Sequence, residues 1–373
     1  MGAYLDHASV SPLRPEVAAA LHEVLAVAQA DPGRPYSEAL VVRSLIEDAR
    51  DEVAGLASVT SRQVVFTSSI AESINTAMAS LAQGGQVLVT GTERSSVAEA
   101  AARYGAVREL RVDGAGHLDL EHLADLLRQH PGSLVCCQVA NHETGVVTDV
   151  DGVMTAARAQ GARVHIDASM ALGHVELDLG ALDADAVTIA SELLGGPVGV
   201  AGLLVKKGRV LPPLLVGGSQ ERARRAGLEN LLGIVGFGVA AAVLRSPEVR
   251  QREADAARAQ IAELEKIVLA VDGTAAVGAG STERRAPHLR CFTIEGIEAE
   301  PVLLGLDRRG VSIHSGSACS SESLEPSPVL RAMGLEADRS LRVSVGHSTT
   351  HEDVEVFRRA FEPVISDLRS LST

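Results

Sequence analysis

A cysteine in a loop of small residues is the strongest chemical signal in the sequence. Residues 312–334 read "SIHSGSACSSESLEPSPVLRAMG", so glycine and serine surround Cys319 before two prolines introduce a predicted helix. A cysteine on such an exposed, mobile loop is available for nucleophilic chemistry through its thiolate. Glu322 and Glu325 disfavour the thiolate by repulsion, so its reactivity needs help from another group in the fold.

The other three cysteines carry weaker signals. Cys136 and Cys137 lie in the apolar run "SLVCCQVAN", which predicts a buried strand, and we expect both thiols to be inert core groups. Cys291 shares no CxxC spacing with them. No grouping of histidine with acid or cysteine has the spacing of metal ligands, so we predict no metal site.

A second stretch has the form of a reactive site without a reactive residue. Residues 190–199 read "ASELLGGPVG", in which glycine and proline predict a tight turn after a strand. No lysine, serine or cysteine stands immediately before the glycines. The chain contains only three lysines, Lys206, Lys207 and Lys266, and none is placed to substitute.

The elements that must position these residues alternate regularly. Between residues 60 and 207, short runs rich in valine and isoleucine alternate with segments of helical period, which predicts a mostly parallel sheet covered by helices on both faces. After residue 245 a long charged helix and shorter pieces predict a second, α+β domain. We expect residues 1–14 to join that small domain, residues 15–245 to form the large one, and residues 246–373 to carry the cysteine loop.

Ligands of open α/β sheets gather at the carboxyl ends of the strands. Asp167 closes the predicted strand "RVHIDA", where its carboxylate would either meet a cationic ring nitrogen or cap the next helix. Ser68, Ser69 and Ser73 flank a predicted helix start that would hold a phosphate or serve as an ordinary cap. The residues alone leave both pairs of alternatives open.

Six segments together resemble one family. They are "YLDHASVSPL", "VVFTSSIAESIN", "HIDASMALGHVELDL", "GGSQERARRAGLEN", "SGSACSSESLEPSPVLRAMG" and "LRVSVGHSTT". In this order they resemble the cysteine desulfurases, class V members of the fold type I enzymes that use pyridoxal phosphate (PLP). The resemblance implies an α/β, PLP-transferase-like fold whose large domain holds a mostly parallel seven-stranded sheet, beside a small α+β domain. It also implies that Asp167 pairs with the pyridine nitrogen, Cys319 becomes a persulfide and Arg342 holds the substrate carboxylate.

The same resemblance locates substitutions around the cofactor. Leu193 stands at the position of the lysine that forms the imine with PLP, and Glu192 at that of the preceding histidine. Arg94 replaces a histidine stacked on the ring, and Leu228 replaces a threonine that reaches the phosphate of the neighbouring subunit. The degenerate PLP pocket would comprise Ser69, Ile70, Ala71, Arg94, His142, Asp167, Met170, Glu192 and Leu193.

These substitutions predict weak cofactor binding. Two hydroxyls that would bond the phosphate are missing, and each such bond to a charged group is worth about 1.5–3 kcal/mol. Their loss weakens binding by about two to four powers of ten. We therefore expect no tightly bound cofactor, and PLP only in a non-covalent complex.

Three functions remain open at this stage. In the first, Cys319 accepts or carries a persulfide without catalysis by PLP, beside an active partner. In the second, the protein is an unconventional cysteine desulfurase that binds PLP non-covalently. In the third, it is a pseudoenzyme that binds a different small ligand through Arg94, His142 and Glu192.

Charge and hydropathy exclude two classes of partner. The net charge of -14 disfavours nucleic acid and anionic lipid. The longest apolar run, residues 231–244, is shorter than the roughly 20 residues of a membrane span, and no charged-then-apolar leader is present, so we expect a cytoplasmic protein. The resemblance implies a homodimer, or a heterodimer with a PLP-active paralogue, and a protein that donates or accepts sulfur.

Overall fold

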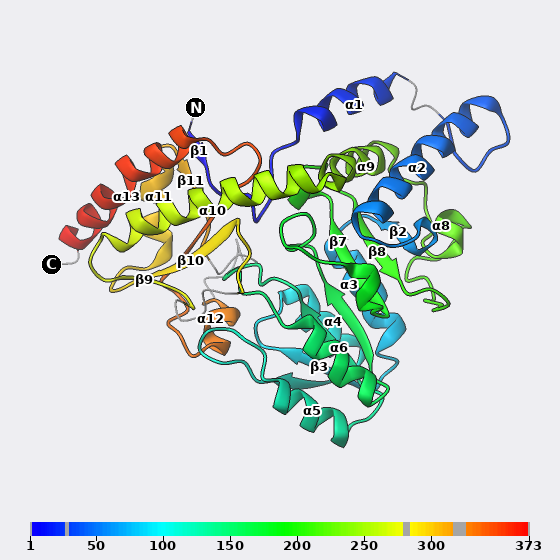
Figure 1. Ribbon diagram of the computed structural model, residues 1–373, viewed down its shortest axis with the longest axis horizontal. Coiled ribbons are helices and arrows are strands. Elements are labelled where there is room, and N and C mark those ends of the chain that lie inside the picture. Colours follow the sequence, from blue (N-terminus) through cyan, green and yellow to red (C-terminus); the bar gives the residue numbers. More distant parts are fainter. Residues whose placement is uncertain (1, 27–29, 279–283, 316–325, 372–373) are drawn as a thin grey trace.

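The computed structural model describes residues 2–26, 30–278, 284–315 and 326–371 (Figure 1). Within them a seven-stranded sheet forms the centre of the larger part of the molecule. Its strands, in spatial order, are β2 (Val64–Thr67), β8 (Ala201–Val205), β7 (Ala186–Ala190), β6 (Arg163–Asp167), β5 (Leu134–Gln138), β3 (Gln86–Thr90) and β4 (Ala106–Leu110). Strands β3 to β7 run parallel to one another, and β8 is antiparallel to both of its neighbours. The predicted α/β architecture with a mostly parallel seven-stranded sheet is therefore confirmed.

Helices cover both faces of this sheet because successive strand residues point to opposite sides. On β3, Val87 and Val89 belong to one buried cluster, whereas Leu88 belongs to another. Helices α3 (Ile70–Leu81) and α4 (Ser95–Tyr104) complete the first cluster. The second is completed by α2 (Ser37–Leu56), α5 (Leu120–Gln129), α6 (Val150–Ala159) and α9 (Leu231–Arg245), and α1 (Pro15–Leu25) packs on α9.

The adjacent cysteines of β5 show this alternation directly. Cys136 belongs to the cluster under α3 and α4, and Cys137 belongs to the cluster on the other face. Both side chains are at most 2% exposed, and burial raises the pKa of both thiols. They are inert core groups, as predicted.

The C-terminal part is built on a different, antiparallel sheet. Strands β12 (Ser340–Ser344), β10 (Leu289–Ile294) and β9 (Thr274–Ala276) pair in that order. Helices α10 (Pro247–Leu269), α11 (Ala299–Asp307) and α13 (His351–Leu371) pack around them in one hydrophobic cluster. The short β1 (Ala3–Tyr4) pairs in parallel with β11 (Val311–Ser312), so the N-terminal residues pack with the C-terminal part of the chain.

A buried ion pair anchors the loop between β8 and α9 to α2. Arg50 Nη1 lies 2.7 Å from Glu221 Oε2, and the backbone N–H of Phe66 donates to the same oxygen at 2.9 Å. Glu221 and Arg222 in α8 (Gln220–Ala223) have φ angles of 49° and 58°, a left-handed conformation that costs energy for residues with a side chain. The ion pair therefore holds a strained loop beside β2.

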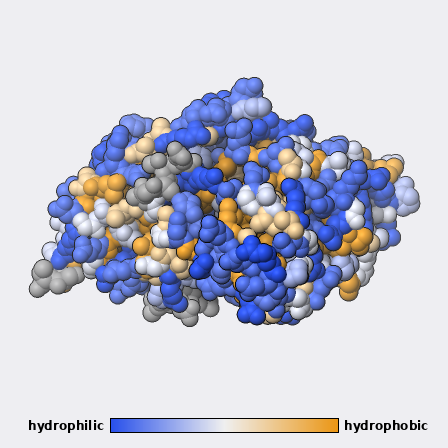
Figure 2. All heavy atoms as spheres, turned by 60° about the horizontal axis from the view of Figure 1, so that its bottom comes forward, coloured by the Kyte–Doolittle hydropathy of each residue, from blue (hydrophilic) through white to orange (hydrophobic). Residues whose placement is uncertain are grey.

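Two surface properties bear on partners. No single helix in the described ranges is long and apolar enough to cross a membrane, and only α9 and α10, bent by 86°, meet those criteria as a pair. Figure 2 shows a face on which hydrophilic residues dominate and hydrophobic residues form separate patches.

Candidate functional site

The predicted ring partner, Asp167, is already paired within the chain. It is the last residue of β6 and 3% exposed, and Arg94, at the N-cap position of α4, places Nε 2.8 Å from its Oδ2. Ser169 N donates to the other carboxylate oxygen at 2.9 Å, while Arg94 Nη2 donates to Ser169 Oγ at 3.1 Å. Burial acts to raise the pKa of Asp167, but Arg94 and Ser169 lower it below its ordinary value. Asp167 is thus an anion held by Arg94, in a turn that leads into no helix before Leu179.

Glu93 adds a second, neutral carboxyl beside this pair. It is 4% exposed, and its Oε1 accepts from Gln138 N at 3.1 Å, but Oε2 is buried without a hydrogen-bond partner among the described residues. Burial, and then the negative charge of Asp167, raise the pKa of Glu93 to about 8. Sequence reasoning missed this residue, although it adjoins Arg94 in a segment that follows a predicted strand.

The turn at Leu193 is held by its backbone. It forms the 3-10 helix η2 (Glu192–Leu194), in which the carbonyl of Glu192 accepts from Ser11 N at 2.9 Å and that of Leu193 accepts from His174 Nε2 at 3.1 Å. Gly195 has φ 77°, and a Cβ there would lie 2.8 Å from the Arg14 side chain. Packing therefore explains why the glycine turn persists with Leu193 buried inside it.

Glu192, in contrast, places a carboxyl oxygen in the interior. Its Oε2 has no hydrogen-bond partner in the part of the chain that the structure describes, and burial raises its pKa above the ordinary value while Arg94 lowers it. Glu192, Arg94 and Asp167 therefore interact within one electrostatic cluster.

The lysines lie elsewhere. Lys206 directly follows β8, which is antiparallel to β7, and its backbone N–H donates to the carbonyl of Asp185 at the start of β7. Leu193 lies past the other end of β7. The sheet therefore separates Lys206 and the adjoining Lys207 from Leu193, and Lys266 is an exposed residue of α10.

The predicted phosphate stretch is used for helix capping. Ser69 is the N-cap of α3, and its Oγ accepts from Glu72 N at 3.1 Å. The backbone N–H of Ser68 donates to Glu72 Oε2 at 2.7 Å, and Arg225 pairs with Glu72 at 2.9 Å. The next two residues, Ile70 and Ala71, offer no hydroxyl. Ser69 therefore acts as a helix cap, and phosphate binding at this helix start stays a prediction.

Arg342 also meets a partner from its own chain. It lies on β12, is 2% exposed, and donates from Nη2 to Asp6 Oδ1 at 2.7 Å and to Ser9 Oγ at 2.6 Å. Its Nη1 donates to the carbonyl of His142 at 2.9 Å. Burial, then the charges of Arg94 and Arg342, lower the pKa of His142 to about 3, so its ring is neutral. Asp6 and Ser9 lie in a motif that the sequence singled out, but the motif did not show that they pair with Arg342.

Met170 lies in a separate group of histidines. Its Sδ is 3.4 Å from Nε2 of His288, whose ring stacks on that of His174 with centroids 4.0 Å apart. His7 and His347 lie edge to face with centroids 6.3 Å apart beside the same small cavity of about 10 Å³. Such a volume holds at most about one water molecule. The space next to Leu193 is therefore filled by side chains.

The structure thus brings Arg94, His142, Asp167, Glu192 and Arg342 into one charged cluster at the carboxyl edge of the sheet. Cys319 lies outside the described residues, as do Glu322 and Glu325. Among the residues that are described, no group of three or more histidine, cysteine or acidic side chains is arranged to hold a metal ion.

This cluster does not fit a PLP ring bound through a lysine. The carboxylate that would meet the pyridine nitrogen is paired with Arg94, and the serine hydroxyl near the phosphate position is a helix cap. A Schiff base needs an amine, and the turn at Leu193 supplies none.

Comparison with known proteins gives one consistent result. The sequence profile of the aminotransferase class-V family matches residues 3–357. Cysteine desulfurase IscS 1 of Archaeoglobus fulgidus is 34% identical over 390 residues, which cover 99% of this chain and 98% of that protein. Cysteine desulfurase NifS of Azotobacter vinelandii is 33% identical over 381 residues, covering 99% and 94%. The X-ray structure of a NifS-like protein from Rickettsia africae superimposes with a TM-score of 0.91 at 28% identity, over 98% of this chain and all of that one.

Proposed function

Because the chain belongs to the cysteine desulfurases of the aminotransferase class V family, we propose that it acts in sulfur transfer through Cys319, without a lysine-bound cofactor. The Arg94–Asp167 ion pair is the observation that carries this proposal. The family is PLP-dependent, and the resemblance assigns the carboxylate of Asp167 to the pyridine nitrogen. In this chain that carboxylate is paired with Arg94 instead. Leu193 at the expected lysine position supports the same conclusion.

The proposed reaction is the transfer of one sulfur atom. The Cys319 thiolate attacks the outer sulfur of a donor persulfide, R–S–SH. An S–S bond forms at Cys319 as the donor's S–S bond breaks, and the donor leaves as the thiolate R–S⁻. Atoms and electrons balance without an oxidant, and Cys319 then presents the sulfur to an acceptor protein.

We also propose that the chain works as a dimer, with a second copy or with a PLP-active relative. Exposed apolar side chains support this part. On α2, Leu40 and Val41 are 51% and 50% exposed, and in the loop before α9 Val216 and Leu228 are 80% and 62% exposed. A second subunit that covered these side chains would remove their apolar surface from water.

The decisive experiment measures the mass of the intact protein after incubation with a persulfide donor. The wild type should gain one sulfur atom, and Cys319→Ala should gain none. Cys136→Ala is the control, since that thiol is buried and inert. If Cys319→Ala gains as much sulfur as the wild type, the proposal is wrong.

Non-covalent binding of PLP is the second candidate. It is favoured by the geometry of the Arg94–Asp167 pair, whose Nε and Oδ2 atoms are close but not aligned as a hydrogen bond. An unaligned pair is the easier one for a pyridinium to displace. The absorbance spectrum, recorded after adding PLP, dialysing and then adding cysteine, tests this. A retained band that shifts with cysteine would establish the second candidate, and its absence would exclude it.

A further inference from the structure

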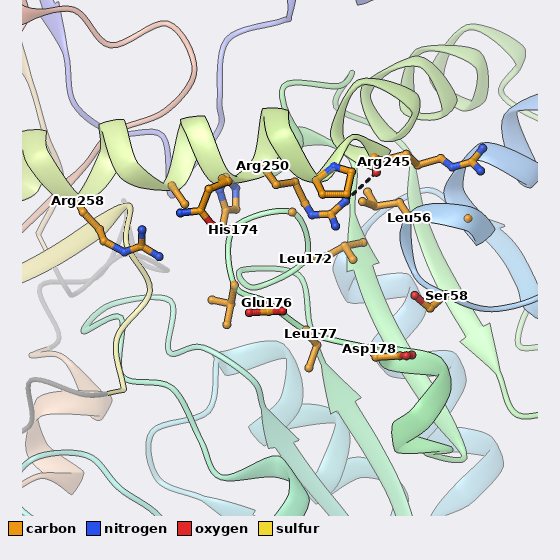
Figure 3. Close-up of a pocket in the computed structure, with 16 residues that line it drawn as sticks. Leu56, Ser58, Leu172, His174, Glu176, Leu177, Asp178, Arg245, Arg250 and Arg258 are labelled. Carbon is orange, nitrogen blue, oxygen red and sulfur yellow. Dashed lines mark hydrogen bonds between the residues drawn. The ribbon is translucent and has the colours of Figure 1, made fainter.

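A polar groove lies apart from the charged cluster described above. It has a volume of about 490 Å³ and runs between α10 and the segment 172–178, with the C-terminal end of α2 at its side (Figure 3). That volume lies within the range of sites for small molecules. The groove contains none of Arg94, Asp167, Glu192 or Arg342.

Arg250 presents a fixed cation to this groove. Its Nη1 donates to the carbonyls of Leu244 and Arg245 at 2.5 and 3.1 Å, which ties the guanidinium to the C-terminal end of α9 (Figure 3). No carboxylate of the described residues forms an ion pair with it. The remaining N–H groups of Arg250 are therefore pre-organised donors, and little entropy is lost when they bind an anion.

Glu176 presents an anion from the opposite wall. It is exposed, and within the described ranges it forms neither an ion pair nor a side-chain hydrogen bond. Arg250 and Glu176 line the same groove, but they lie too far apart to pair with each other. Two opposite charges separated by the width of a groove are complementary to a ligand that carries both signs.

The two other arginines of the groove extend its positive wall. Arg258 pairs with Asp255 on its own helix, and Arg245 pairs with Glu52 on α2. Both arginine side chains are at least half exposed. Exposed pairs of this kind contribute little stability, so a ligand carboxylate can replace the protein carboxylate at low cost.

His174 completes the groove with an acceptor. Its Nε2 meets the carbonyl of Leu193, which can only accept, so Nε2 carries the proton and Nδ1 is left as an acceptor. Burial keeps the ring neutral by lowering its pKa. His174 thus lines the groove and also touches the turn at Leu193.

We propose that this groove binds a small peptide-like zwitterion with two carboxylates and one ammonium group. The ammonium lies at Glu176, and the carboxylates lie at Arg250 and Arg258. This binding goes beyond the sulfur-transfer function and does not depend on Cys319.

Isothermal titration calorimetry with S-methylglutathione tests the proposal. This tripeptide has the required charges, and its blocked sulfur cannot react with Cys319, so the result is independent of persulfide chemistry. Arg250→Gln and Glu176→Gln are the groove variants. Arg252→Gln is the matched control, because Arg252 is an exposed residue of the same helix outside the groove.

Each groove variant should raise the Kd about tenfold, since each removes one charge-assisted contact, and the control should match the wild type. Glutarate has two carboxylates and no ammonium. Its binding should be weakened by Arg250→Gln but not by Glu176→Gln. The proposal is overturned if the wild type gives no binding heat, or if both groove variants bind as tightly as the wild type. Unchanged circular dichroism of the variants ensures that a loss of binding is not a loss of fold.

Discussion

Glu93→Gln should stabilise the protein by an amount that grows as the pH rises. In the folded protein the pKa of Glu93 is about 8, against an ordinary value of 4.5, and burial is the main cause. A carboxyl with a raised pKa contributes stability that is fully present below pH 4.5 and is lost as the pH rises through 8. Glutamine has nearly the same shape and cannot ionise, so the variant avoids this loss.

The size of the effect follows from the two pKa values. Between them, each pH unit costs the wild type about 1.4 kcal/mol relative to the variant. From pH 5 to pH 7 the difference in the free energy of unfolding should therefore widen by roughly 2–3 kcal/mol. The substituted glutamine keeps an oxygen to accept from Gln138 N, so the hydrogen bond of Oε1 is not lost.

Urea unfolding followed by far-ultraviolet circular dichroism at pH 5, 6, 7 and 8 measures this difference. Glu99→Gln, on the exposed face of α4, is the control and should show a constant difference, because Glu99 is in water in both states. If the Glu93→Gln difference is also constant from pH 5 to 8, Glu93 is not a buried neutral acid. Glu93 would then be an anion that faces Arg94 together with Asp167.

Three further outcomes are expected. Leu193→Lys should not restore alanine release from cysteine, because Arg94 still occupies Asp167, and measurable desulfuration would show that the lysine alone was missing. His7→Gln should reduce the stability that the protein loses as the pH falls below 6.5, by about 1.4 kcal/mol of unfolding free energy per pH unit in acid titrations. Burial and His347 lower the pKa of His7 to about 3 in the folded protein, so the unfolded state gains the proton first. Arg50→Ala should cost about 3–5 kcal/mol in urea unfolding, because Glu221 stays buried without its partner, and a cost under about 1 kcal/mol would contradict the role given to that pair.

The layered architecture of the central sheet was predictable because its sequence signal is periodic. Apolar runs such as that of β5 are buried on both faces, and the amphipathic segments between them bury one face only, so local patterns report the layers. Cys136 and Cys137 were assigned to the core on the same grounds. Pairing of β1 with β11 joins residues about 300 positions apart, and no local pattern encodes such a contact.

The partners of the site residues were not predictable. Arg94 and Asp167 are 73 positions apart, and Arg342 and Asp6 are 336 apart. The sequence identified three of these four residues as candidates, but it could not show that each cation would neutralise an anion of the same chain. That outcome depends on how far side chains reach between segments that are distant in the chain, which only the packed structure sets.

By itself, the sequence determined the α/β class, the family and the absence of a lysine at the turn of Leu193. These features are properties of composition, periodicity and residue order. Only the tertiary structure decided that Glu93 is neutral, that Arg94 holds Asp167, and that Arg250 and Glu176 face one groove without an ion pair to any described residue. Charge states and ion pairs depend on burial and on distances of a few ångströms, and both are fixed by contacts between residues far apart in the chain.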